Sequence, residues 1–130
     1  MIGILILKTI QKSNVFFQEY PETNEVIRLD IGDNIDRWHP MTDISKGKCN
    51  VQFLNELKID LATIGNNEGI GLAKHWLNEV YQEADFDVIL GNLEDDNGRP
   101  AWAEPYKIYE TKAGTKIAFF SLYFSLLSDL

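Results

Sequence analysis

Residues 26–37, VIRLDIGDNIDR, form the stretch that decides the fold. Ile27, Leu29 and Ile31 occupy alternate positions, which is the period of a β-strand with one buried face. Gly32 permits a sharp turn, so the strand is expected to end there and to deliver Asp33 to a loop. In an open α/β sheet, ligands bind beyond the carboxyl ends of the strands. The stretch therefore predicts a strand that leads into a functional loop.

A second stretch has the same plan. An apolar strand ends at Ile64 and breaks into Gly65-Asn66-Asn67-Glu68-Gly69. If the two strands are parallel, both polar loops lie at one edge of the sheet. Simpler roles remain open for these residues. Asp33 could serve only as a turn former, and residues 66–68 could cap the following helix, whose start could also receive a phosphate.

The remaining pattern favours one α/β domain over residues 1–130. Strands are predicted at 2–7, 25–31, 60–64 and 86–91, and helices at 47–57 and 70–83. Strands that alternate with helices indicate a mostly parallel sheet with right-handed crossovers. A β-hairpin is predicted from 106–111 and 116–120 around Ala113-Gly114. A short helix near 15–17, an irregular excursion at 38–43 and an apolar tail at 122–130 complete the chain.

Composition excludes some classes of function. Twenty acidic and 12 basic residues give a net charge of −8, and no run is rich in Lys or Arg. This balance argues against a nucleic-acid-binding or membrane surface. Cys49 is the only cysteine, so no intramolecular disulfide can form, and a helical first turn is its expected place. With no signal peptide visible, we expect a cytoplasmic protein.

The two loops, together with residues 84–93 and 105–111, resemble the calcineurin-like metallophosphoesterases, specifically the 5′-nucleotidase branch. The resemblance extends over roughly residues 25–121. It implies a sandwich of two sheets between helices, of which this chain would form the amino-terminal half. It also implies a dinuclear metal centre at the strand ends that hydrolyses phosphate esters such as nucleotides.

The resemblance implies roles for particular residues. Asp33 would bridge two divalent ions, such as Mn, Zn or Mg, and Asn66 would bind one of them through its amide oxygen. A carboxylate can span two cations, and paired ions activate water and clamp a phosphate. The other candidates in the site loops are Asp30, Asp36, Arg37, His39 and Glu68.

The chain departs from the family pattern in three places. The family has an Asp-x-His motif after its first strand, but residues 9–20 contain neither Asp nor His. The position after the metal-binding asparagine is usually a histidine, and here it is Asn67, which cannot supply a proton at neutral pH. The Gly-His-x-His motif is also absent. We therefore expect an incomplete site, weak metal binding at best, and weak or no hydrolysis.

Three other readings stay open. The chain could be a working hydrolase that is completed by a partner chain or by residues outside it. It could be a non-catalytic interaction module or a gene fragment, or a flavodoxin-like domain that binds a small phosphate ligand.

Self-association is expected as well. The strands at 2–7 and 88–90 are apolar throughout, and two helices would cover only one face of the sheet. A two-fold homodimer that pairs the bare faces or the edge strands would cover this surface, and the tail at 122–130 could be exchanged between subunits.

Overall fold

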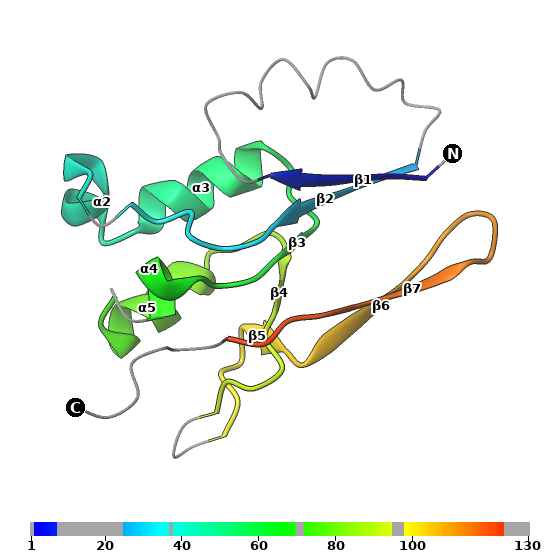
Figure 1. Ribbon diagram of the computed structural model, residues 1–130. Helices are drawn as coiled ribbons and strands as arrows, with labels where there is room; N and C mark the ends of the chain where they lie inside the picture. Colours follow the sequence, from blue (N-terminus) through cyan, green and yellow to red (C-terminus); the bar gives the residue numbers. More distant parts are fainter. Residues whose placement is uncertain (1, 8–24, 37, 70–71, 95–97, 124–130) are drawn as a thin grey trace.

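The computed structural model describes residues 2–7, 25–36, 38–69, 72–94 and 98–123. Within them, five strands form a sheet in the order β1-β2-β3-β4-β5, and each neighbouring pair is parallel. Two further strands, β6 and β7, form an antiparallel hairpin. Figure 1 shows the helices on one side of the sheet and this hairpin on the other. The prediction of a mostly parallel α/β fold with a hairpin is confirmed.

The strands are β1 Ile2–Leu7, β2 Glu25–Asp30, β3 Leu61–Ala62, β4 Asp87–Ile89, β5 Ala103–Glu104, β6 Tyr106–Glu110 and β7 Lys116–Phe120. The helices are α2 Pro40–Ser45, α3 Lys48–Glu56, α4 Asn66–Gly69 and α5 Lys74–Tyr81. The first two strands, the hairpin and α3 match their predicted positions closely. β3 and β4 are shorter than predicted, and two-residue β5 has too few residues to show a period.

Two helical segments correct the sequence analysis. Residues 38–43 were predicted to be irregular, but α2 begins at Pro40, where the missing N–H of proline costs no hydrogen bond. His39 caps this helix, because its Nδ1 accepts from the N–H of Met41 at 3.2 Å. The loop after β3 contains the helical turn α4, and Ala73 is extended (ψ 141°), so α5 begins only at Lys74 instead of at residue 70.

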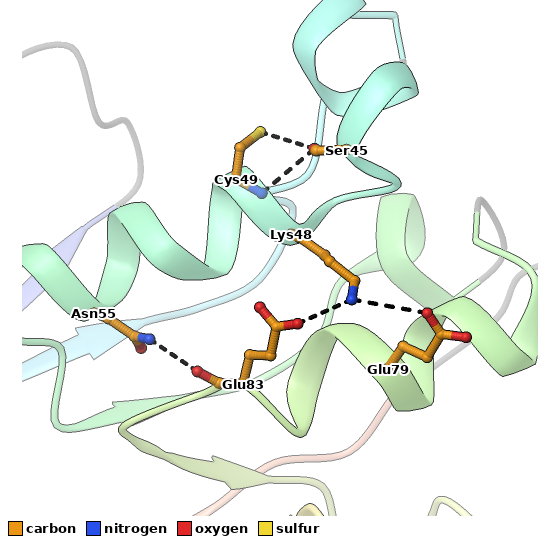
Figure 2. Close-up of polar contacts among 6 residues, drawn as sticks. All are labelled: Ser45, Lys48, Cys49, Asn55, Glu79 and Glu83. Carbon is orange, nitrogen blue, oxygen red and sulfur yellow. Dashed lines mark hydrogen bonds and ion pairs between the residues drawn. The ribbon is translucent and has the colours of Figure 1, made fainter.

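One face of the sheet is covered by α3 and α5. The main core contains residues of both helices and of the strands and loops beneath them: Val51, Leu54, Leu77, Val80, Tyr81, Ala62, Ile64, Val88 and Leu90. Figure 2 shows how the two helices are joined at the surface. Lys48 of α3 lies 2.9 Å from Glu83 and 3.8 Å from Glu79, and Asn55 donates to the carbonyl of Glu83. Cys49 lies in the first turn of α3, as expected, where it accepts from Ser45.

The hairpin covers the other face. Its inward side chains, Tyr109, Ile117 and Phe119, pack against Ile27, Leu61 and Ile89 of the sheet. The expectation that this face is bare is therefore wrong over these residues, because it counted only helices as cover.

Two polar contacts fix the hairpin in place. The hydroxyl of Tyr109 donates to Glu25 at 2.9 Å, and the ammonium of Lys107 lies 2.6 Å from the carboxylate of Asp87. One contact reaches the start of β2 and the other reaches β4, so the hairpin is held at two separate strands of the parallel sheet.

The helix predicted near residues 15–17, Arg37 and residues 124–130 of the tail lie outside the described residues. No helix in the described part of the chain has both the length and the apolar composition of a membrane span.

Candidate metal-binding site at the ends of β2 and β3

The loops that follow β2 and β3 touch at two glycines. A Cβ on Gly32 would lie 2.5 Å from the backbone nitrogen of Gly65, and a Cβ on Gly65 would lie 2.2 Å from Oδ1 of Asp33. Gly32 also has a φ of +89°, a conformation that other residues rarely adopt. Because β2 and β3 are parallel neighbours, both loops leave the sheet at one edge. The predicted meeting of the two loops is thus found in the structure.

Glu68 holds the two loops together. Its carboxylate is fully buried and accepts three backbone hydrogen bonds, from Asp33 at 3.0 Å, Ile35 at 2.8 Å and Gly65 at 2.7 Å. The bond from Gly65 is half of a capping box, since Glu68 is the third residue of the turn that Gly65 precedes. Glu68 thus caps the turn α4 and not the helix predicted at 70–83, because α5 begins after Ala73 with no side-chain cap. The two bonds from Glu68 to the other loop are not predicted by the sequence.

Asp33 stands above this buried carboxylate with its side chain exposed. Its φ of +60° is unusual for a residue with a Cβ, and such strain often marks functional sites. One carboxylate oxygen accepts from the N–H of Asn67 at 3.0 Å. Asn67 thus contacts Asp33 through its backbone N–H. Among the described residues, the side chain of Asn67 makes no hydrogen bond.

Asn66 places its side-chain amide beside Asp33. The amide lies 3.2 Å from both carboxylate oxygens and donates to them when its nitrogen faces them. If the amide oxygen faces them instead, three oxygens point to one place, which only a cation would stabilise. The structure therefore brings together the two residues that were expected to bind metal.

Asp30 lies beneath the loops at the end of β2. It is 6% exposed, and its carboxylate accepts from the N–H of Gly32 at 2.7 Å. Burial is the main reason that the pKa of Asp30 rises from 3.8 to about 6, and the negative charges of Glu68 and Asp33 add to the rise. The hydrogen bond from Gly32 and the nearby amide of Asn34 act in the opposite direction. Three carboxyl groups thus share this small region, and a bound cation would offset their repulsion.

Tyr81 of α5 is buried near the carboxyl groups of Glu68 and Asp30. Burial raises the pKa of its hydroxyl well above the usual value, and the charge of Glu68 raises it further. The Tyr81 ring stacks on Trp102 with 5.0 Å between centroids. Tyr81 belongs to the helix predicted at 70–83, and a helical period shows which residues are buried but not which charged groups lie near them.

The remaining candidates from the sequence are Asp36, His39 and Arg37. Asp36 accepts from the N–H of Trp38 at 2.9 Å, which closes a local turn, and His39 caps α2. Both side chains thus act within their own segment in this structure. Arg37 is outside the described residues.

A cavity of about 100 Å³ lies beside Asp30, between the sheet and the end of the hairpin. Thr63 and Ser121 line it and share a hydrogen bond of 2.6 Å between their hydroxyls. Cavities that enclose small-molecule ligands usually measure about 300–1,000 Å³. A ligand of nucleotide size therefore does not fit inside this cavity.

Few side chains in the described part of the chain are placed to act together as metal ligands. No group of three or more His, Cys, Asp or Glu side chains in that part is arranged to hold a metal ion. Asp33 and Asn66 are exposed, although Asp33 accepts from the N–H of Asn67, while Asp30 and Glu68 are buried and accept from backbone N–H groups. The residues present thus fit part of a metal centre.

Comparison with known proteins supports the resemblance seen in the loops. The chain is 51% identical over 96 residues to YunD of Bacillus subtilis (strain 168), which is described as an uncharacterized metallophosphoesterase. This match takes in 73% of the chain and 21% of YunD. A scan against protein-family models finds no match.

Solved structures agree on the fold. The calcineurin-like phosphoesterase YfkN from Bacillus subtilis superposes with a TM-score of 0.65 at 22% identity, over 85% of this chain and 39% of that chain. The NAD nucleotidase NadN of Haemophilus influenzae gives 0.69 at 23% identity, over 86% of this chain and 19% of that one.

The resemblance to calcineurin-like metallophosphoesterases is therefore confirmed. The chain spans only about a fifth to two fifths of the lengths of these relatives.

Proposed function

We propose that this chain carries part of a dinuclear metal site of the metallophosphoesterase type, with Asp33 and Asn66 as ligands, and that by itself it hydrolyses phosphate esters weakly or not at all. The observation that carries this proposal is that the loops after β2 and β3 place Asn66 next to Asp33, where its amide nitrogen donates to both carboxylate oxygens at 3.2 Å. Rotation of the amide would direct its oxygen toward an ion bound by Asp33. When bound, the metal would polarise a phosphate ester and activate water.

The surroundings of these two residues are suited to a cation. Gly32 and Gly65 let the two loops approach closely, and Glu68 fixes the backbone of Asp33 in a strained conformation. Such preorganisation lowers the cost of binding, because the ligands need not be ordered when the ion arrives. The nearby charge of Asp30 and Glu68 adds attraction for a positive ion.

The small number of ligands explains the expected weakness. Stable transition-metal centres take about three or four protein ligands per ion, and Asp33 and Asn66 supply two between them. We therefore expect Mn²⁺ to bind with a Kd on the order of 100 µM or weaker, and not in the nanomolar range of complete centres.

Calorimetric titration with Mn²⁺ tests the metal site. Asp33→Ala is expected to weaken the binding at least about tenfold, since it removes the shared ligand. Asp36→Ala is the matched control, because it removes an equal charge from the same loop and should change the affinity less than about twofold. Sub-micromolar binding that is lost in Asp33→Ala would show a far more complete site. Equal effects of the two substitutions would show that charge alone attracts the ion.

Turnover tests the expected low activity. With Mn²⁺ present, release of nitrophenol from a chromogenic phosphodiester and of phosphate from nucleoside monophosphates should stay near background. Asn67→His should not change this result, because a proton donor cannot replace missing metal ligands. Robust turnover by the unmodified chain would contradict weak activity, and turnover gained only in Asn67→His would show that the proton donor was the missing part.

A further inference from the structure

Asn50 of α3 contacts the loop that carries Asp33. Its side-chain nitrogen donates to the backbone carbonyl of Asn34, the residue after Asp33, at 2.8 Å. Its side-chain oxygen accepts from the hydroxyl of Thr42 at 3.2 Å. The two contacts use different atoms of the amide, so they fix which atom faces the loop. One side chain thus joins α2, α3 and the loop after β2.

The contact with Asn34 holds one particular peptide group. The carbonyl of Asn34 and the N–H of Ile35 belong to the same planar unit. Asn50 binds the carbonyl, and Glu68 accepts from the N–H at 2.8 Å. Because both ends of this unit are held, its plane cannot turn without the loss of a hydrogen bond. Glu68 also accepts from the N–H of Asp33, so the backbone is held on both sides of Asn34.

Asn50 has rigid surroundings. The next residue, Val51, is fully buried in the main core. Thr42, which donates to Asn50, is itself buried on α2. Sites that are held by packed helices are more precise than sites on loops. Asn50 therefore joins the Asp33 loop to the packed helices, whereas Glu68 joins it to the neighbouring loop.

We propose that Asn50 is a positioning residue for Asp33, because its hydrogen bond to Asn34 sets the direction in which the Asp33 carboxylate faces a bound cation. This proposal rests on the metal site proposed above. Replacement of a residue that orients a metal ligand usually weakens metal binding by about 10–100-fold. Asn50 acts through the backbone and not on the carboxylate itself, so we expect a smaller effect of about five- to tenfold.

Asn55 provides a matched control on the same helix. Both asparagines are half-buried, and the amide of Asn55 also contacts a neighbouring backbone segment. It donates to the carbonyl of Glu83 and accepts from the N–H of Asp85, both at 2.9 Å. Figure 2 shows the contact with Glu83, which follows α5. Asn50→Leu and Asn55→Leu thus each remove an amide that joins α3 to another segment, but Asn50→Leu is the variant that releases the Asp33 loop.

The affinity for Mn²⁺, measured from the electron paramagnetic resonance signal of free Mn²⁺, is the first readout. Asn50→Leu should raise the Kd about five- to tenfold and Asn55→Leu less than about twofold, although both should lower the urea midpoint of unfolding. Thr42→Val keeps Asn50 but removes the donor to its oxygen, and should raise the Kd about two- to threefold. In an Asn50→Leu background, Thr42→Val should have no further effect. Equal rises in Kd for the two asparagine variants would overturn the proposal, because they would reflect a general loss of stability.

Amide hydrogen exchange of the metal-free chain is the second readout, and it does not depend on the proposed function. In Asn50→Leu, the amide protons of Asp33 and Ile35 should exchange at least about tenfold faster relative to the amides of β2. In Asn55→Leu, this change should be less than about twofold. If the unmodified chain binds no Mn²⁺, the proposed function fails, and the exchange rates alone decide whether Asn50 positions the loop. Unchanged exchange at Asp33 and Ile35 in Asn50→Leu would overturn the proposal.

Discussion

Two regions of the molecule differ in how well they are packed. The loops after β2 and β3 are hydrogen-bonded and in close contact, whereas the outer face of the hairpin is exposed. At the loops, the buried carboxylate of Glu68 has three donors, and the backbones of Gly32 and Gly65 are in contact. On the hairpin, the inner side chains are packed while Tyr106, Ile108 and Phe120 remain exposed.

This difference teaches where the chain is self-sufficient. The loops are joined by hydrogen bonds among residues 33–68, all within this chain. The hairpin packs on the sheet through its inner face, while Tyr106, Ile108 and Phe120 on its outer face are exposed. Substitutions at the loops should therefore reduce the stability of the chain, while substitutions on the outer face of the hairpin should leave that stability almost unaltered.

The largest effect is expected for Glu68→Ala. The substitution removes the acceptor of three buried backbone N–H groups, and each unsatisfied donor is costly. We expect a loss of about 3–5 kcal/mol in the free energy of unfolding, measured by urea denaturation. Glu79→Ala, on the exposed side of α5, should change it by less than about 0.5 kcal/mol. A loss below about 1 kcal/mol in Glu68→Ala would mean that the loops keep their shape without this carboxylate.

A smaller effect is expected for Gly32→Ala, and Gly98 provides the comparison. Both residues have a φ near +90°, but a Cβ on Gly98 would meet nothing within 4 Å, whereas one on Gly32 would collide with the Gly65 backbone. Gly98→Ala should lower the free energy of unfolding by about 1 kcal/mol through backbone strain alone. Gly32→Ala should lower it by about 2–4 kcal/mol. Equal losses in chemical denaturation would show that the loops are not in tight contact.

Asp30→Asn should change the pH dependence. The folded pKa of about 6 lies above the unfolded value of 3.8, so the folded state holds a proton that the unfolded state has released. Stability linked to Asp30 is therefore present below about pH 4 and is lost as pH rises through about 6.

The free energy of unfolding of Asp30→Asn should thus exceed that of the wild type by about 1–3 kcal/mol at pH 7.5. This difference should shrink toward pH 4. Urea denaturation of both proteins across this pH range measures it. A gain of the same size at every pH would rule out a role for the charge of Asp30.

The smallest effect is expected on the outer hairpin face. Ile108→Thr keeps a β-branched side chain at a position that is 53% exposed, and should change the unfolding free energy of dilute protein by less than about 0.5 kcal/mol. Ile27→Thr makes the same replacement at a site that is 1% exposed and should cost about 2–4 kcal/mol. Comparable losses at about 1 µM would mean that the hairpin face contributes to the monomer's own core.

The sequence predicted the parts that depend on local pattern. The period of residues 25–31, the helical stripe of α3 and the hairpin around Gly114 all follow from residues close together in the chain. The adjacency of the two loops was also predictable, because parallel neighbouring strands end at one edge. The absence of Asp and His from residues 9–20 can also be read directly, since no folding can add such a residue.

Other features depend on contacts that sequence patterns do not show. The spacing of Gly65 and Glu68 signals a capping box, but the bonds from Glu68 to Asp33 and Ile35 join residues more than 30 positions apart. The raised pKa of Asp30 likewise follows from burial beneath both loops, and a composition count cannot reveal it.

By itself, then, the sequence determined β1, β2, α3, the hairpin, the two polar loops and the absence of Asp and His from residues 9–20, because each is fixed by residue type and spacing. Only the tertiary structure decided that Glu68 joins the loops, that Asn66 faces Asp33, and that the hairpin leaves its outer face exposed. These features depend on distances between segments that are far apart in the chain, and such distances exist only once the sheet has formed and its layers have packed.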